Sequence, residues 1–224
     1  MKRIIVYTVF LFTATLCNGQ SFEAGVIGGL NFANWNTEVQ NIERDVTSAT
    51  KYGIGAVVTY NLNCNYAIQI EPMYLGKGSK INAHDDSPEI NVETFYFEIP
   101  LLLKASFGEV IRPFVLAGPS LGFFLSGNSK AEVSNLNIEM DLKPITKSTD
   151  ISLTFGAGAI LPVWKGSLFI EGRYSFSLAN NSKNGLVEWK YDNTVINIEE
   201  LSAEENQFKN RGITLMIGYS IPIF

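Results

Sequence analysis

The chain has 224 residues, with 17 Lys+Arg against 22 Asp+Glu and a formal net charge of −5. This length is typical of a single domain, and an acidic chain without a basic patch is not expected to bind nucleic acid. Although 46% of the residues are hydrophobic, no apolar run after residue 20 is long and uncharged enough for a membrane-spanning helix. A membrane location would therefore require a closed β-barrel, because only helices and closed barrels satisfy every backbone polar group in lipid.

Residues 1–19 have the pattern of a secretory signal peptide: a positive start at Lys2 and Arg3, an apolar stretch, and a short small-residue end. We expect cleavage before Gln20. Residues 20–224 then form the mature chain, which we interpret as one domain.

Eight segments of the mature chain alternate between apolar residues and polar or small ones. Strands produce this pattern because successive side chains point to opposite faces. In chain order the segments are residues 22–33, 51–62, 65–76, 94–107, 112–126, 150–163, 167–178 and 212–224.

The segment 94–107 shows the alternation most clearly. One face holds Glu98 and Lys104, and the other face has no polar residue. The run is too long for an ordinary strand and too charged for a membrane helix. It suits a tilted strand that crosses a bilayer, with lipid on one side and a filled polar interior on the other. The apolar row consists of Phe95, Phe97, Ile99, Leu101, Leu103, Ala105 and Phe107.

The connections between the segments alternate strictly between short and long. The short ones lie near residues 62–65, 107–111 and 163–166, and the long ones near residues 34–50, 77–91, 127–149 and 179–211. Bacterial outer-membrane barrels have tight periplasmic turns and long outer loops in this way. The sequence therefore predicts an all-β fold, a monomeric eight-stranded antiparallel up-and-down transmembrane β-barrel in the cell outer membrane. The alternative fold is a soluble lipocalin-like barrel, in which the apolar rows would face inward and the charges would face water.

Six prolines fall inside or at the rim of these segments, where proline cannot donate to a strand ladder. A closed barrel has no edge strands, so we expect bulges or strand ends at several of these positions. The six are Pro72, Pro100, Pro113, Pro119, Pro162 and Pro222.

Several motifs resemble the PorT-type outer-membrane β-barrel domain family of Gram-negative bacteria, which is porin-like. They are Tyr-Phe-Glu-Ile-Pro-Leu-Leu-Leu-Lys at residues 96–104, Arg-Pro-Phe at residues 112–114 with Ala-Gly-Pro at residues 117–119, Glu-Gly-Arg-Tyr-Ser at residues 171–175, and Asn-Arg-Gly-Ile at residues 210–213 with Gly218 and Tyr219. The resemblance implies an eight-stranded barrel, and one branch of the family is linked to protein secretion across the outer membrane. The last segment is similar to the carboxy-terminal signal that the barrel-assembly machinery reads, with Gly218, Ile221, Ile223 and Phe224 matching.

Six charged residues fall on the inward rows of the predicted barrel. An eight-stranded barrel has an interior only wide enough for side chains to fill, and buried charges must pair because an unpaired one costs several kcal/mol. We interpret these charges as a structural plug of ion pairs that closes the lumen, with a narrow ion or proton path as the alternative. They are Glu71, Glu98, Lys104, Arg112, Glu171 and Arg173.

The sequence offers little chemistry beyond these charges. His84 is the only histidine, and it lies among turn-forming residues of a polar loop. A role in an outer-membrane lipid-modifying enzyme is an alternative, but we expect no enzyme. No Cys/His cluster or calcium-loop spacing is present, so no metal or cofactor is expected. Residues 199–206 could form a short acidic helix in the last loop.

These observations favour a structural or binding protein that acts through its extracellular loops. The lipid-modifying enzyme, an accessory of protein secretion and an open pore are the alternatives. The expected partners are outer-membrane lipid, the barrel-assembly machinery during insertion, and an extracellular or periplasmic protein whose identity no residue indicates.

Overall fold

A computed structural model of the chain describes residues 21–37, 45–82, 90–133, 136–191, 194–204 and 207–223. None of these residues belongs to a helix long and apolar enough to span a membrane. The expected signal peptide, residues 1–19, lies outside the described residues. The strands are β1 (Ser21–Thr37), β2 (Asp45–Asn61), β3 (Tyr66–Ile70), β4 (Met73–Asn82), β5 (Ile90–Ser106), β6 (Arg112–Val133), β7 (Leu136–Asp141), β8 (Thr149–Val163), β9 (Gly166–Ser177), β10 (Gly185–Tyr191), β11 (Thr194–Leu201) and β12 (Phe208–Pro222).

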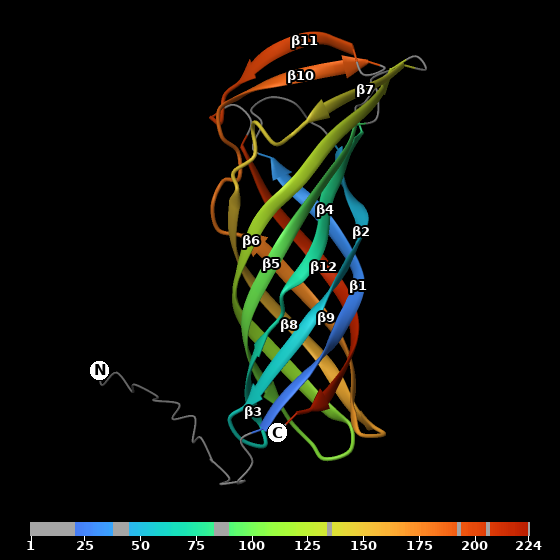
Figure 1. Cartoon of the computed structure of the whole chain (residues 1–224), viewed down its shortest axis with the longest axis vertical. Coiled ribbons are helices and arrows are strands. Elements are labelled where there is room, and N and C mark those ends of the chain that lie inside the picture. The colour runs from blue at the N-terminus through green and yellow to red at the C-terminus, as the bar shows by residue number, and fades with distance from the viewer. Residues whose placement is uncertain are drawn as a thin grey trace, which may run out of the picture.

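Nine of these strands close into a barrel (Figure 1), in which β3 and β4 together make one wall strand between β2 and β5. The ring then runs through β6, β8, β9 and β12, and β12 pairs with β1 to close it. Every pairing is antiparallel. The predicted eight-stranded antiparallel up-and-down barrel is confirmed.

Proline accounts for the one broken strand in this ring. Glu71 and Pro72 separate β3 from β4, and the Pro72 carbonyl accepts a hydrogen bond from the Ala56 amide at 3.0 Å. The ladder between β5 and β6 also skips the positions opposite Pro119. Both features follow from the missing proline N–H. Pro113, Pro162 and Pro222 lie within two residues of a strand end.

The barrel wall turns apolar side chains outward. Val26 and Leu103 are 65% and 66% exposed, while Glu98 and Lys104 on the inward rows are buried. Exposed large apolar residues occur on every strand of the ring except β4. The lipocalin-like alternative is therefore wrong for this chain, because it requires the apolar rows to face inward and the charges to face water.

The two ends of the barrel differ. We call the end with the short connections the turn end, and the chain finishes there (Figure 1). At the opposite end, the loop end, β6 continues to Val133, beyond the predicted limit at residue 126. The long connections 127–149 and 179–211 contain β7, β10 and β11, so they are largely folded.

The acidic helix expected at residues 199–206 is wrong for the described part of that segment, which ends β11 and then turns. Valine, isoleucine and threonine favour a strand here. β11 begins Thr-Val-Ile-Asn-Ile, and this run pairs antiparallel with β10.

Candidate functional site

The lumen holds a first group of buried charges around Arg173, which we call the Arg173 cluster. The guanidinium of Arg173, on β9, donates to both Glu71 and Glu171, and its Nη1 lies 2.5 Å from Glu71 Oε2. Gln69 donates its amide to Glu71, and Lys104 donates to Gln69 Oε1 at 3.0 Å. Two carboxylates thus share one guanidinium, which binds Glu71 in the bidentate manner for which arginine is suited. Lys104 joins the cluster through Gln69.

Lys104 also makes aromatic contacts toward the turn end. Its ammonium lies 4.3 Å from the ring centre of Phe114 and 5.5 Å from that of Phe169. Both rings are buried, and such cation–π contacts stabilise an ammonium removed from water. Aromatic side chains therefore flank the Arg173 cluster on the side of the turn end.

A second group of buried charges, the Lys77 cluster, lies nearer the loop end. Lys77 of β4 forms ion pairs with Glu98 of β5 and with Asp150 of β8, the latter at 3.1 Å. Asn210 of β12 donates to Asp150 Oδ2 at 3.0 Å and to the Tyr96 hydroxyl at 3.4 Å. The cluster joins strands on opposite sides of the lumen.

Apolar side chains fill much of the remaining interior. The buried apolar cluster of the lumen consists of Ile27, Val57, Met73, Leu75, Leu102, Phe114, Leu116, Phe169 and Met216.

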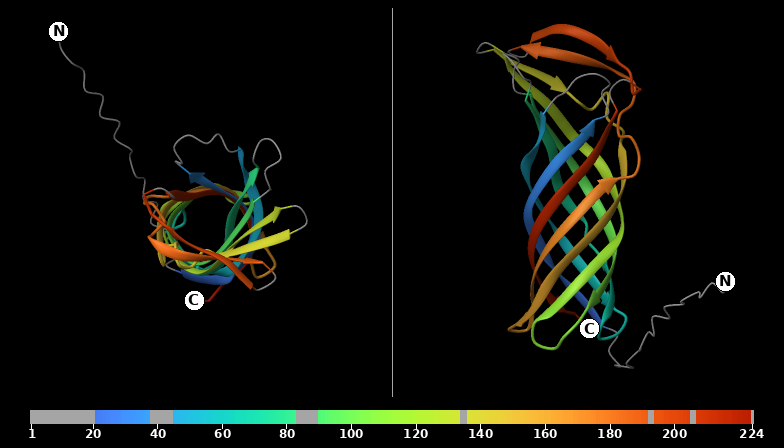
Figure 2. Two further views of the ribbon diagram at one scale, coloured as in Figure 1. Left: turned by 90° about the horizontal axis from the view of Figure 1, so that it is seen from above. Right: turned by 180° about the vertical axis from the view of Figure 1, so that it is seen from behind.

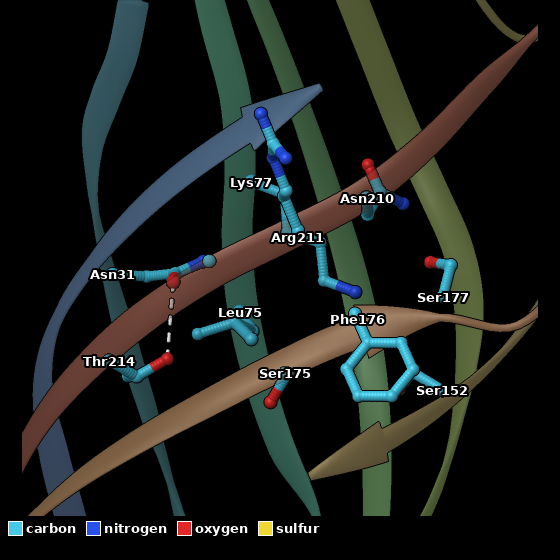
Figure 3. Close-up of a pocket in the computed structure, with 11 residues that line it drawn as sticks. Asn31, Leu75, Lys77, Ser152, Ser175, Phe176, Ser177, Asn210, Arg211 and Thr214 are labelled. Carbon is cyan, nitrogen blue, oxygen red and sulfur yellow. Dashed lines mark hydrogen bonds between the residues drawn. The ribbon is translucent and has the colours of Figure 1, made fainter. Parts of the chain in front are cut away.

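A small cavity lies between the Lys77 cluster and strands β9 and β12 (Figure 3). Its volume is about 20 Å³, enough for about one water molecule. Asn31 donates to the Gly76 carbonyl at 2.8 Å and accepts from the Thr214 hydroxyl at 3.1 Å, so its amide is held in place at the wall of this cavity. The cavity is too small for an organic ligand.

The loop end carries a sheet outside the ring. The upper part of β6 pairs with β7, β7 pairs with β10, and β10 pairs with β11 (Figures 1 and 2). We call β7, β10, β11 and this part of β6 the outer sheet. Its inner face covers a second apolar core, in which Val187 is fully buried. The buried members of this outer core are Val92, Leu142, Ile145, Val187 and Phe208.

The opposite face of the outer sheet is charged. Lys130 on β6 pairs with Glu139 on β7 at 2.7 Å, and Lys190 on β10 pairs with Glu188 at 3.1 Å. The hydrogen bond to Glu139, together with its charge, raises the pKa of Lys130 above its ordinary value. One face of this sheet therefore covers an apolar core, and the other is solvated, with ion pairs beside exposed apolar side chains such as Leu186 and Ile198.

Sequence comparison now places the chain. The family model described as "Outer membrane protein beta-barrel domain" matches residues 18–183, about three quarters of the chain. This chain belongs to the outer membrane protein beta-barrel domain family. As a member it resides in the cell outer membrane, so the turn end is periplasmic and the loop end, with the outer sheet, is extracellular.

Several solved structures match this chain over most of its length, but their sequence identity to it is low. The attachment invasion locus protein Ail of Yersinia pestis is 12% identical, with a TM-score of 0.42, and the match covers 91% of this chain and 100% of that one. OprG from Pseudomonas aeruginosa is 9% identical, with a TM-score of 0.45 and coverage of 90% and 97%. The protease OmpT from Escherichia coli is 9% identical, with a TM-score of 0.42 and coverage of 91% and 97%. At these values the neighbours support no functional statement. No curated protein matches the chain by sequence.

The structure places five of the six predicted lumen charges inside this outer-membrane barrel. Glu71, Glu171, Arg173 and Lys104 meet in the Arg173 cluster, and Glu98 lies in the Lys77 cluster. These five residues are all buried.

Arg112 was predicted to be a lumen charge, and this prediction is wrong. It is the first residue of β6, and its guanidinium donates to the Cys64 carbonyl and, at 2.8 Å, to Ser106 Oγ. It therefore lies at the periplasmic rim, where it ties two turns together, and it joins neither buried cluster. Alternation assigned its face, but not its distance from the barrel end.

Lys77 and Asp150 are not among the predicted lumen charges. Lys77 follows the third predicted segment, which ends at Gly76, and Asp150 is the first residue of the sixth. The alternation that placed Ser152 inward also places Asp150 inward, and that signal could have identified it.

His84 and Phe224 lie outside the described residues. Among the residues that the structure does describe, no cluster of His, Cys, Asp and Glu has the arrangement of a metal site.

Proposed function

We propose that this protein is a plugged outer-membrane barrel whose working part is the outer sheet, which binds a protein partner outside the cell. The observation that carries the proposal is the complete burial of Val187 at the extracellular end. An apolar core outside the ring holds β7, β10 and β11 in one fixed arrangement. A preformed surface loses less conformational entropy on binding than mobile loops do.

The lumen supports this assignment by leaving little room for transport. Two ion-pair clusters and a buried apolar cluster occupy the described interior, and the cavity beside the Lys77 cluster, of about 20 Å³, holds about one water. We therefore assign the lumen a structural role as a plug. The motifs at residues 96–104 and 171–175 resemble the PorT-type family, and an accessory role in secretion is the alternative function.

Binding by the outer sheet is tested with the intact protein in nanodiscs and a Val187→Asp variant. A buried carboxylate would disrupt the outer core, while the barrel, with its separate core, would stay folded. Leu186→Asp is the matched control, because Leu186 is the neighbouring residue and is 61% exposed.

The bait proteins are incubated with proteins exported by the same bacterium and by bacteria that share its habitat. We expect a ligand that the wild type and Leu186→Asp retain and that Val187→Asp loses. Heat-modifiability on a gel must remain the same for all three proteins, which shows that the barrels are intact. Identical retention by Val187→Asp, or no retained ligand at all, would overturn the proposal.

The proposal assigns no catalytic role to the protein. We expect His84→Ala to leave the lipid A profile of cells that express the protein unchanged. A modification of lipid A that appears with the wild type and disappears with His84→Ala would instead establish the lipid-modifying enzyme.

A further inference from the structure

β11 is a free edge of the sheet. Among the described strands it pairs with β10 on one side and with none on the other. Seven of its eight residues are exposed. A strand in this position presents a row of backbone N–H and C=O groups that point away from its neighbour and can pair with another chain.

The side chains of β11 protect this edge only in part. Natural edges are commonly protected by lysine, proline, other charged residues or a bulge, and β11 contains no lysine or proline. Val195, Ile196 and Ile198 are exposed instead. A register shift beside Ile196 leaves Asn197–Leu201 as the regular part of the edge, and this part carries the exposed carboxylates Glu199 and Glu200.

The position of β11 in the molecule limits what could pair with it. β11 is the strand farthest from the periplasmic end in both side views (Figures 1 and 2). Two copies in one membrane would therefore turn their β11 edges outward from the cell and not toward each other. The geometry favours an occupant that approaches from the extracellular side.

We propose that β11 accepts an added β-strand from an extracellular protein, in the form of an extended segment that alternates apolar residues with lysine or arginine. Backbone hydrogen bonds to the free edge would supply affinity, as in other cases of strand addition. On one face of β11 the basic residues would pair with Glu199, and on the other face the apolar residues would cover Ile198. This inference rests on the proposed function, because it names the partner class of the outer sheet.

The first test uses three ten-residue peptides and the intact protein in nanodiscs, with binding measured by fluorescence anisotropy. The probe alternates valine and lysine. One control replaces every lysine with glutamate, and the other keeps the probe sequence but carries a methyl group on every backbone nitrogen. We expect the probe to bind and each control to bind at least about tenfold more weakly.

The N-methylated peptide separates strand addition from simple charge attraction, since it keeps every side chain and loses only the backbone donors. If it binds as tightly as the probe, or if the probe does not bind, the proposal is overturned.

The second test compares Ile198→Lys with Leu186→Lys. The two positions are 59% and 61% exposed and lie on the same face of the outer sheet, but only Ile198 is on the edge strand. We expect Ile198→Lys to weaken probe binding at least about tenfold and Leu186→Lys to change it less than threefold. Equal effects at the two positions would overturn the proposal.

The same variants separate this inference from the proposed function. If the exported ligand is lost by Val187→Asp but kept by Ile198→Lys, the outer sheet binds through another surface and only the edge proposal fails. If the wild type retains no exported ligand, the proposed function itself fails.

Discussion

At the scale of single residues, we expect substitution of Arg173 to reduce the stability of the protein most. Its guanidinium is the cation between Glu71 and Glu171, and all three side chains are buried. Truncation would leave two carboxylates facing each other in the lumen. We predict that Arg173→Ala lowers the free energy of unfolding by roughly 3–5 kcal/mol, the usual cost of stranding a buried charge.

Urea unfolding in detergent measures this loss. Removing Glu171 as well should cost less than the sum of the two single substitutions, because the residues share one network. An Arg173→Ala protein that unfolds at the wild-type midpoint would mean that the charge is not buried.

The alternation of inward and outward residues limits the candidate partners of Arg173 but does not decide between them. Alternation puts Glu71 and Glu98 inward, so either carboxylate could be the partner of Arg173. The structure pairs Arg173 with Glu71 and gives Glu98 to Lys77. The pairing depends on the height of each residue along the barrel axis. The alternation within a single strand does not give that height.

The glycines beside Lys77 show a second limit of the sequence. Gly76 and Gly78 are typical of a turn, yet both belong to β4. A Cβ on Gly78 would lie 2.1 Å from the Val92 carbonyl oxygen, so glycine is required there by the close approach of β5. The sequence alone does not distinguish a glycine that a close strand contact requires from a glycine in a turn.

Trp164 stands in the two-residue turn between β8 and β9 with a φ of 60°. Its side chain is fully exposed within the chain. A residue with a Cβ is strained at this φ, and glycine is not. We predict that Trp164→Gly unfolds at a higher urea concentration than Trp164→Ala, since both lack the ring and only glycine relieves the backbone. A lower midpoint for Trp164→Gly would contradict the turn conformation.

At the scale of elements, period-two alternation identified the wall of the barrel but not the outer sheet. Val187 and Trp189 alternate with Leu186 and Glu188, yet the stretch is short and its neighbours are polar. The outer core that buries Val187 draws on β5, on β12 and on the segment between β7 and β8. Such contacts between distant segments decide the fold of a loop, and no local pattern contains them.

Amide hydrogen exchange tests the outer sheet directly. Residues 189–191 of β10 pair with β7 on one side and with β11 on the other. We predict that the amides of residues 189–191 exchange more slowly than those of β11, whose free edge exposes part of its backbone to water. Equal and rapid exchange in both strands would mean that the outer sheet is not formed.

At the scale of the whole molecule, the proposed plug and the proposed binding surface lie at different heights along the barrel axis. The membrane-spanning part presents apolar side chains to lipid and holds the Arg173 and Lys77 clusters in its lumen. The extracellular part has its own apolar core and a charged outer face. A plugged barrel can serve as a rigid support for a binding surface without acting as a channel.

Planar-bilayer conductance tests this closed barrel most directly. We predict that the purified, folded protein inserts without producing current steps above the baseline of the lipid, while an open porin in the same membrane conducts. The side chains of both clusters and the lumen's apolar cluster leave room for about one water in the described cavity. Stable ohmic steps from the wild-type protein would contradict the plugged lumen, and with it the placement of the working surface outside the barrel.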